Sequence, residues 1–188
     1  MTIWKVMCNN DYRNFCLVNS NNEYVTDILS HFEEKQEEPY FSRTIRTLKD
    51  DNNPLGDIMN YSSMSGTFLV NERTKKVLEK HFNEIQFFNT ICPEYPEEKF
   101  FILNVLNYKD VLDINKSKYT TGISRYGELK IGTIKSYAFK EEVRNLDIFK
   151  IIVNGKKRIN HLFVTDTFKN IMEQNKITGL SLRKVYEI

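Results

Sequence analysis

The chain has 188 residues, of which 40% are hydrophobic and 28% are charged, with 13 Phe, 10 Tyr and one Trp. This apolar content argues against disorder along the whole chain. No stretch reaches the roughly 18 consecutive apolar residues that a membrane span needs. We therefore expect one domain over residues 1–188, large enough to bury a core of its own.

The net charge is only +2, but the charges are unevenly distributed. Residues 1–129 contain 15 Lys and Arg against 19 Asp and Glu, whereas residues 130–188 contain 12 against 6. Such asymmetry can accompany nucleic-acid binding. Most of the basic residues are dispersed, however, and only Lys156–Arg158 form a run. We interpret that run as solvated hairpin residues, with a phosphate-binding patch as the alternative, and we do not favour nucleic acid as the partner.

The cysteines and the first residues indicate a cellular compartment. Cys8, Cys16 and Cys92 form no CxxC pair, and their odd number and spacing predict reduced, buried thiols rather than disulfides or a metal site. The first residues lack the basic leader and apolar run of a secretory signal. The many Asn and Lys residues favour a bacterial, AT-rich genome. We expect a bacterial cytoplasmic protein without a metal site.

The N-terminal third carries few structural signals. Alternating residues at 2–7 predict a strand, and residues 24–32 favour a short helix. Residues 33–61 are polar and interrupted by proline and glycine, so we expect irregular structure there with a strand at 42–48. The first 60 residues are thus the least clearly assigned part of the domain.

A strand followed by a capped amphipathic helix occurs twice. The two segments are FLVNERTKKVLEK, which begins at Phe68, and LFVTDTFKNIMEQ, which begins at Leu162. Asn71 is the expected helix cap in the first, and Thr165 or Asp166 in the second. Each helix is followed by another predicted strand, at residues 85–88 and 180–186. The pattern predicts two strand–helix–strand units of similar build.

The region between these units is rich in strands. We expect them at residues 100–106, 129–133, 137–139 and 148–153. The nearly all-apolar FFILNVLN favours a central strand covered on both faces, and Asn154-Gly155 is typical of a tight hairpin turn. The predicted fold class is α+β, with a mixed, largely antiparallel sheet and a few short helices packed on one side.

Residues for catalysis are few. The chain lacks GxGxxG, GxxxxGK[ST], GxSxG and HExxH, and its three histidines are isolated. The most suggestive stretch is Asp110–Tyr119, in which Ser117 stands between two lysines and can be imagined as a nucleophile with its base. Adjacent side chains on a strand point to opposite faces, which disfavours that pairing. We expect no enzymatic activity and keep a hydrolase or transferase using this stretch as the alternative.

Residues 66–188 resemble immunity proteins of bacterial polymorphic toxin systems, family eleven. The resemblance is carried by the order of several segments: FLVNERTKKVLEK with QFF, FFILNVLNYKDVLDINKSKY, IFKIIV, and LFVTDTFKNIMEQNKITGLSL. It implies a cytoplasmic protein that binds a cognate toxin domain non-covalently and neutralises it, with no catalysis and no cofactor.

Candidate toxin contacts fall in two places. An acidic run is either a solvated face or a patch that steers a basic toxin by charge; its members are Glu33, Glu34, Glu37 and Glu38. Asp113, Ser117 and Tyr119 lie in the family-like stretch, where a Tyr offers large contact area at low entropy cost. These last three residues can equally serve the fold.

Overall fold

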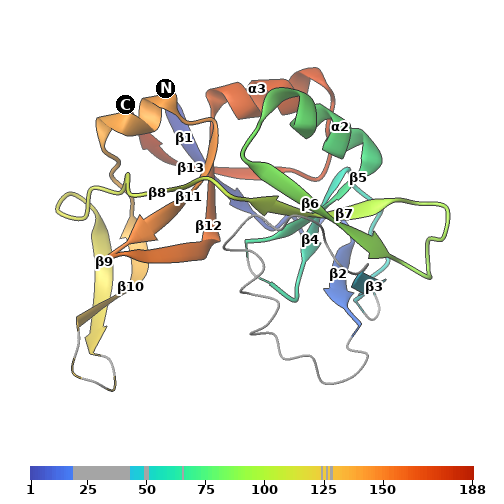
Figure 1. The fold of residues 1–188 in the computed structure, drawn as a ribbon, viewed down its shortest axis with the longest axis horizontal. Coiled ribbons are helices and arrows are strands. Elements are labelled where there is room, and N and C mark those ends of the chain that lie inside the picture. The colour runs from blue at the N-terminus through green and yellow to red at the C-terminus, as the bar shows by residue number, and fades with distance from the viewer. Residues whose placement is uncertain (19–42, 49–50, 65, 124, 126, 128) are drawn as a thin grey trace.

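The computed structural model describes residues 1–18, 43–48, 51–64, 66–123, 125, 127 and 129–188. These residues form mostly β-structure with few helices (Figure 1). The strands make a five-stranded sheet, a closed six-stranded barrel and a separate two-stranded ribbon. The single mixed sheet that the sequence suggested is therefore divided into three, and most of the strand pairs are antiparallel, as expected.

The five-stranded sheet has the order β13-β1-β12-β11-β8. Its strands are β13 (Ser181–Glu187), β1 (Thr2–Met7), β12 (Lys156–Thr165), β11 (Ile148–Val153) and β8 (Tyr108–Lys109). The predicted hairpin turn is confirmed, because Asn154 and Gly155 have φ of 50° and 70°, as a two-residue turn with positive φ at both positions requires. β12 begins directly after that turn and runs to the residue before α3 (Asp166–Gln174).

The barrel closes in the order β2-β3-β6-β7-β5-β4. Its strands are β2 (Asn14–Leu17), β3 (Arg43–Thr47), β4 (Ile58–Tyr61), β5 (Phe68–Asn71), β6 (Ile85–Ile91) and β7 (Phe100–Val105). Every residue of β7 is buried, which confirms the predicted central strand. β4 contradicts the expectation of irregular structure over residues 33–61, and β2 was not predicted. Each strand has only four residues, and the two pair with each other although they are distant in sequence.

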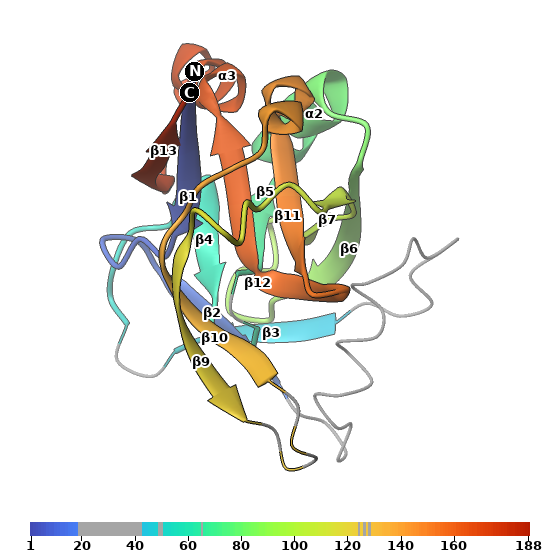
Figure 2. The same ribbon diagram turned by 90° about the vertical axis from the view of Figure 1, so that its left-hand side faces the viewer.

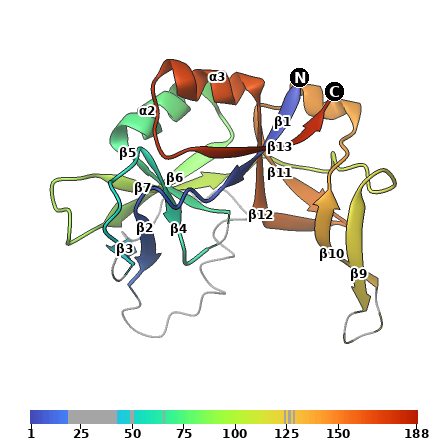
Figure 3. The same ribbon diagram turned by 180° about the vertical axis from the view of Figure 1, so that it is seen from behind.

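The ribbon consists of β9 (Lys118–Ile123) and β10 (Leu129–Ser136), and it extends away from the rest of the molecule in each view (Figures 1, 2 and 3). β9 was not predicted. The register between the two strands shifts between Ile131 and Ile134, so that both side chains are buried although they are three residues apart. The short strand expected at 137–139 is reduced to one isolated bridge.

Two α-helices and a 3₁₀ helix complete the described residues: α2 (Glu72–His81), α3 (Asp166–Gln174) and η1 (Glu141–Asn145). Asn71 caps α2 as predicted, its side chain accepting a hydrogen bond from the backbone amide of Thr74 at 2.9 Å. Thr165 occupies the cap position of α3, but its side chain makes no capping hydrogen bond to the helix backbone. The carboxylate of Asp166 instead accepts hydrogen bonds from the backbone of Thr2 and the indole of Trp4, joining α3 to β1.

The two strand–helix–strand units are confirmed and share a topology. The strand order β6-β7-β5-β4 in the barrel matches β13-β1-β12-β11 in the sheet, with α2 and α3 each leading to the strand two places away. The likeness extends to side chains. Lys75 of α2 lies 4.8 Å from the ring of Phe101 on β7, the strand between β5 and β6. Lys169 of α3 lies 4.6 Å from the ring of Trp4 on β1, the strand between β12 and β13.

A shared apolar core joins the barrel to the sheet. It contains residues from the outer face of the barrel, from one face of the sheet and from both helices, which lie side by side along one end of the molecule (Figures 1 and 3). Phe82 and Phe168 meet within it at 5.3 Å between ring centroids. A second core fills the barrel, and a third lies between the sheet and the ribbon.

Polar contacts stabilise the edge of the interface between the barrel and the sheet. The buried carboxylate of Asp57, just before β4, accepts two hydrogen bonds from Thr178 and one from Asn71, each at 2.8 Å. Arg73 lies 3.4 Å from the same carboxylate. Burial raises the pKa of Asp57, but the hydrogen bonds from Thr178 and Asn71 outweigh it and hold the pKa below its ordinary 3.8.

We predict that Gly179→Ala severely destabilises the protein. Gly179 has φ of 84°, and a Cβ at this position would overlap the carbonyl oxygen of Ile58. Gly155→Ala is the matched control, because Gly155 has φ of 70° with open space around its Cβ position. Chemical denaturation should show a loss of about 3 kcal/mol or more for Gly179→Ala and about 1 kcal/mol for the control. Equal losses would contradict the close approach of the two segments.

We predict that Asp57→Asn lowers the free energy of unfolding by about 3 kcal/mol near neutral pH, because it replaces an ionised acceptor with a neutral amide. The carboxyl has a lowered pKa in the folded state, so its contribution is present above its unfolded pKa and is lost as pH falls through the folded value. Denaturation curves measured below about pH 4 should therefore differ less between the two proteins than curves near neutrality. A constant difference would contradict the assignment.

Candidate partner interface

The sequence-predicted contact residues are separated in the structure. Glu33, Glu34, Glu37 and Glu38 lie outside the described residues, so their contribution stays a prediction. Asp113, Ser117 and Tyr119 lie at the base of the ribbon, directly before β9 or at its start. The ribbon and the sheet face beside it form the candidate interface.

Asp113 and Ser117 fix the base of the ribbon. The hydroxyl of Ser117 accepts a hydrogen bond from the amide of Ala138 at 3.0 Å, and the amide of Asp113 donates to the carbonyl of Ala138 at 2.9 Å. The carboxylate of Asp113 accepts from the amides of Asn115 and Lys116, which closes the turn. Ala138 follows β10, so these bonds join the two ends of the ribbon.

The same contacts bear on the catalytic alternative. The Ser117 hydroxyl is buried and bonded to backbone, which leaves it poorly placed to attack a substrate. Asp110 pairs with Lys140 at 3.1 Å, away from that hydroxyl's partners. Tyr119 is half-buried against the core between ribbon and sheet. The stretch Asp110–Tyr119 thus shows anchoring contacts rather than a nucleophile paired with a base.

The outer half of the ribbon is exposed. Residues 120–123 of β9 are all exposed, and Ile123 reaches 79% exposure, the highest value among the large hydrophobic residues of the described chain. The ribbon has two strands, and neither outer edge is paired within the described residues. Such an edge with exposed side chains can accept a partner.

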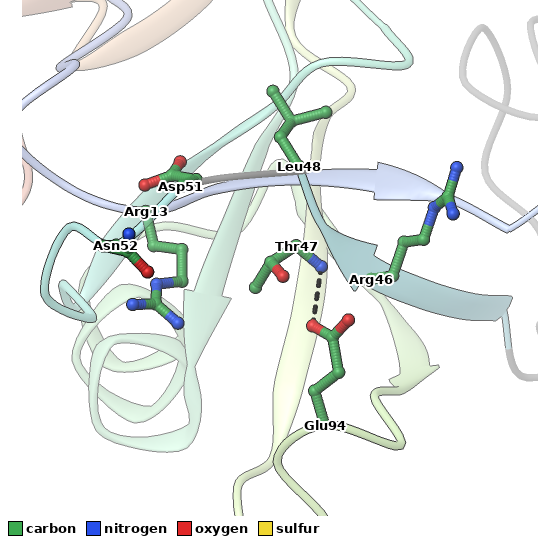
Figure 4. Close-up of a pocket in the computed structure, with 7 residues that line it drawn as sticks. All are labelled: Arg13, Arg46, Thr47, Leu48, Asp51, Asn52 and Glu94. Atoms are coloured by element: carbon green, nitrogen blue, oxygen red, sulfur yellow. Dashed lines mark hydrogen bonds between the residues drawn. The ribbon is translucent and has the colours of Figure 1, made fainter.

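A pocket of about 510 Å³ lies beside the barrel (Figure 4). Its lining comes from the end of β3, from the segment that follows β3, and from the loops after β1 and β6: Arg13, Arg46, Thr47, Leu48, Asp51, Asn52 and Glu94. Glu94 points at Thr47 and accepts its backbone amide at 2.8 Å. Arg13 and Asp51 likewise bind nearby main-chain groups, so most of the charged groups here already have partners.

A second pocket, of about 430 Å³, is markedly basic. It lies between β10 and the β11–β12 turn and is lined by Lys130, Ile131, Val153, Asn154, Lys156, Lys157 and Arg158, without a carboxylate. Arg158 donates a hydrogen bond to the carbonyl of Ile131 at 2.6 Å, which holds the guanidinium against the ribbon. The basic run that we interpreted as solvated hairpin therefore faces a further lysine from β10.

The positive charge continues along the sheet. Lys5 donates to the hydroxyl of Tyr137 at 3.2 Å, and that hydroxyl lies 3.4 Å from Nδ1 of His161. Arg183 is the register partner of Lys5 on the adjacent strand. Burial, followed by the charges of Lys5 and Arg158, lowers the pKa of His161 to about 4.

These residues form what we call the basic face: Lys5, Lys130, Lys156, Arg158, His161 and Arg183. Sequence analysis missed it because its members come from β1, β10, β12 and β13, and only the run at 156–158 marked it. Burial lowers the pKa of Lys5 as well, with a smaller effect from the charge of Arg183. The face is therefore a region of positive potential around a neutral imidazole.

Other kinds of site have less support. Across the described ranges, no three His, Cys, Asp or Glu side chains are grouped as metal ligands. Helices of sufficient length and hydrophobicity to cross a membrane are absent from that same part of the chain. The cysteines are free, and of the three only Cys92 is buried; Cys8 is exposed, contrary to our expectation.

The chain belongs to an immunity protein family. The model of the Immunity protein family (Imm11) matches residues 17–187, nearly the whole chain, which confirms the resemblance seen in the sequence and extends it into the N-terminal region. A search of curated proteins gave no match. Family membership gives the protein an immunity role and implies a protein partner, a toxin, in general terms.

We predict that His161 makes stability depend on pH. Its pKa is about 4 in the folded protein, against 6.5 for the unperturbed group, so the unfolded chain takes up a proton first as the pH falls. The free energy of unfolding should therefore decrease as the pH falls from about 6.5 to about 4. The decrease should be smaller in His161→Gln. Lys5→Met should raise the pKa of His161, measured by NMR titration. An unchanged pKa would show that Lys5 does not act on the imidazole.

Proposed function

We propose that this protein is a cytoplasmic immunity protein of a bacterial polymorphic toxin system, which binds a cognate toxin domain non-covalently and neutralises it without catalysis. The observation that carries the proposal is the family match over residues 17–187. One domain over residues 1–188 performs this role, and neither a metal nor another cofactor takes part.

The ribbon and its surroundings support a binding function. A two-stranded ribbon anchored at its base and exposed along its outer half presents side chains and main-chain groups to another protein at small entropic cost. We propose that Asp113 and Ser117 contribute by holding this ribbon in place, and that Tyr119 contributes contact area at its base. We also propose that Glu33, Glu34, Glu37 and Glu38 provide a second, acidic contact.

The alternative is a hydrolase or transferase that uses the Asp110–Tyr119 stretch. It would need the Ser117 hydroxyl to leave its two contacts with Ala138 and become accessible. The observed geometry gives no reason for that exchange, since breaking the contacts would leave buried backbone groups unpaired. We therefore favour binding over turnover.

The test is protection of cells from the toxin domain that co-purifies with the protein. Co-expression should restore growth, and the two proteins should elute together at a fixed stoichiometry. Ser117→Ala is the informative variant: it should lower thermal stability, because it removes the bond to Ala138, while protection persists wherever the variant is folded.

Two outcomes would contradict this proposal. Cells that die equally fast with folded, well-expressed protein would exclude neutralisation. Loss of protection in folded Ser117→Ala, together with modification or cleavage of the toxin by the wild-type protein alone, would instead support the enzyme. Mass spectrometry of the recovered toxin distinguishes these cases.

A further inference from the structure

The basic face gathers cations that have no ion-pair partner among the described residues. On the helices, at the barrel and on the outer loops, most lysines have a carboxylate within ion-pairing distance, including Lys75, Lys76, Lys99, Lys109, Lys140 and Lys169. On the basic face, Lys5, Lys130, Lys156, Arg158 and Arg183 form no ion pair with any described residue. Some exposed cations elsewhere, such as Lys80 and Arg144, also form no ion pair with a described residue, but the basic face gathers five such cations on adjoining strands and around one pocket.

This surface is accessible and partly preorganised. Lys130, Lys156 and Arg183 are exposed, while Arg158 and Lys5 are half-buried and held by hydrogen bonds to Ile131 and Tyr137. The cations of the basic face repel one another. The half-burial of Arg158 and Lys5 strengthens this repulsion, because less solvent screens their charges. An incoming anionic group would relieve it at little cost in side-chain ordering.

On this basis, and resting on the proposed function, we propose that the basic face docks an acidic surface of the toxin domain, with carboxylates entering the pocket between β10 and the β11–β12 turn. The ribbon flanks that pocket, since Lys130 and Ile131 of β10 form one of its walls. Docking there would bring the exposed ribbon against the same partner.

A protein fits this surface better than a nucleic acid. Single-stranded nucleic acids are held by exposed aromatic rings on which bases stack. The aromatic ring at the centre of the basic face is Tyr137, which is only 6% exposed and packs on Phe163 with 5.1 Å between centroids. The pocket walls combine cations with Ile131 and Val153, a mixture suited to carboxylate side chains carried on an apolar surface.

The test compares two charge-reversal variants for binding to the toxin domain in a catalytically inactive form. Lys130→Glu/Lys156→Glu reverses two exposed charges in the pocket. Lys80→Glu/Arg144→Glu makes the same charge change on α2 and η1, at the other end of the molecule from the β11–β12 turn (Figure 2). Thermal unfolding verifies that both variants are folded.

At low ionic strength, the pocket variant should raise Kd about tenfold or more, mainly through slower association, while the control stays within about twofold. The difference should shrink as salt is added. A toxin variant in which a contacting acidic residue is changed to Lys should regain binding to the pocket variant. The same toxin variant should gain no affinity for the wild-type protein or the control variant, as a double-mutant cycle requires.

Each other result has a separate meaning. Equal Kd values for wild type and pocket variant, with protection intact, would overturn this inference and leave the proposed function standing. A wild-type protein that neither binds the toxin nor protects cells would overturn both. Salt-dependent binding of a duplex DNA probe that Lys130→Glu/Lys156→Glu abolishes, with toxin binding unchanged, would assign the face to nucleic acid instead.

Discussion

The structure depends on the packing of a closed barrel against an open sheet. The contact that fixes their relative position is polar. A buried carboxylate at Asp57 costs free energy unless its oxygens are fully bonded. Here one carboxylate oxygen accepts hydrogen bonds from the backbone amide and the hydroxyl of Thr178, which belongs to the sheet unit. The other oxygen accepts a hydrogen bond from the side-chain amide of Asn71, which belongs to the barrel unit. Only one relative placement of the units satisfies all of these donors, whereas the apolar core beside them would tolerate small displacements. Asp57 therefore contributes specificity of arrangement as well as stability.

The sequence predicted those parts of the fold whose signal is local. Asn71 and the apolar stripe after it suffice to place α2, FFILNVLN suffices for a buried strand, and Asn154-Gly155 suffices for a turn. β9 was missed although it has a nearby partner, β10, because its sequence KYTTGI lacks the regular alternation of apolar and polar residues that predicts a strand. β2 and β4 were missed because each has only four residues and the two strands pair with each other across a long stretch of sequence. Barrel closure is the extreme case, since it depends on β2 reaching both β3 and β4.

The candidate site shows the same division. Asp113, Ser117 and Tyr119 were recognised as a unit, because they are close in sequence, and the structure does bring them together at the base of the ribbon. The basic face was not recognised, because Lys5 and Arg183 stand at opposite ends of the sequence and become neighbours only through the pairing of β1 with β13. Net charge conceals such a surface, since the acidic and basic residues of the whole chain nearly cancel.

The repeated topology explains why one surface is left for a partner. In the barrel unit and in the sheet unit, a helix covers the face that turns toward the other unit, and Phe82 and Phe168 close the contact between these helices. The opposite face of the barrel strands is buried in the interior of the barrel. Among the described residues, the opposite face of the sheet is covered by the ribbon only around Ile131, Ile134 and Phe139. The uncovered remainder is where Lys5, His161 and Arg183 lie. A repeated topology in which one unit closes on itself and the other stays open thus produces a scaffold with a charged surface available for binding.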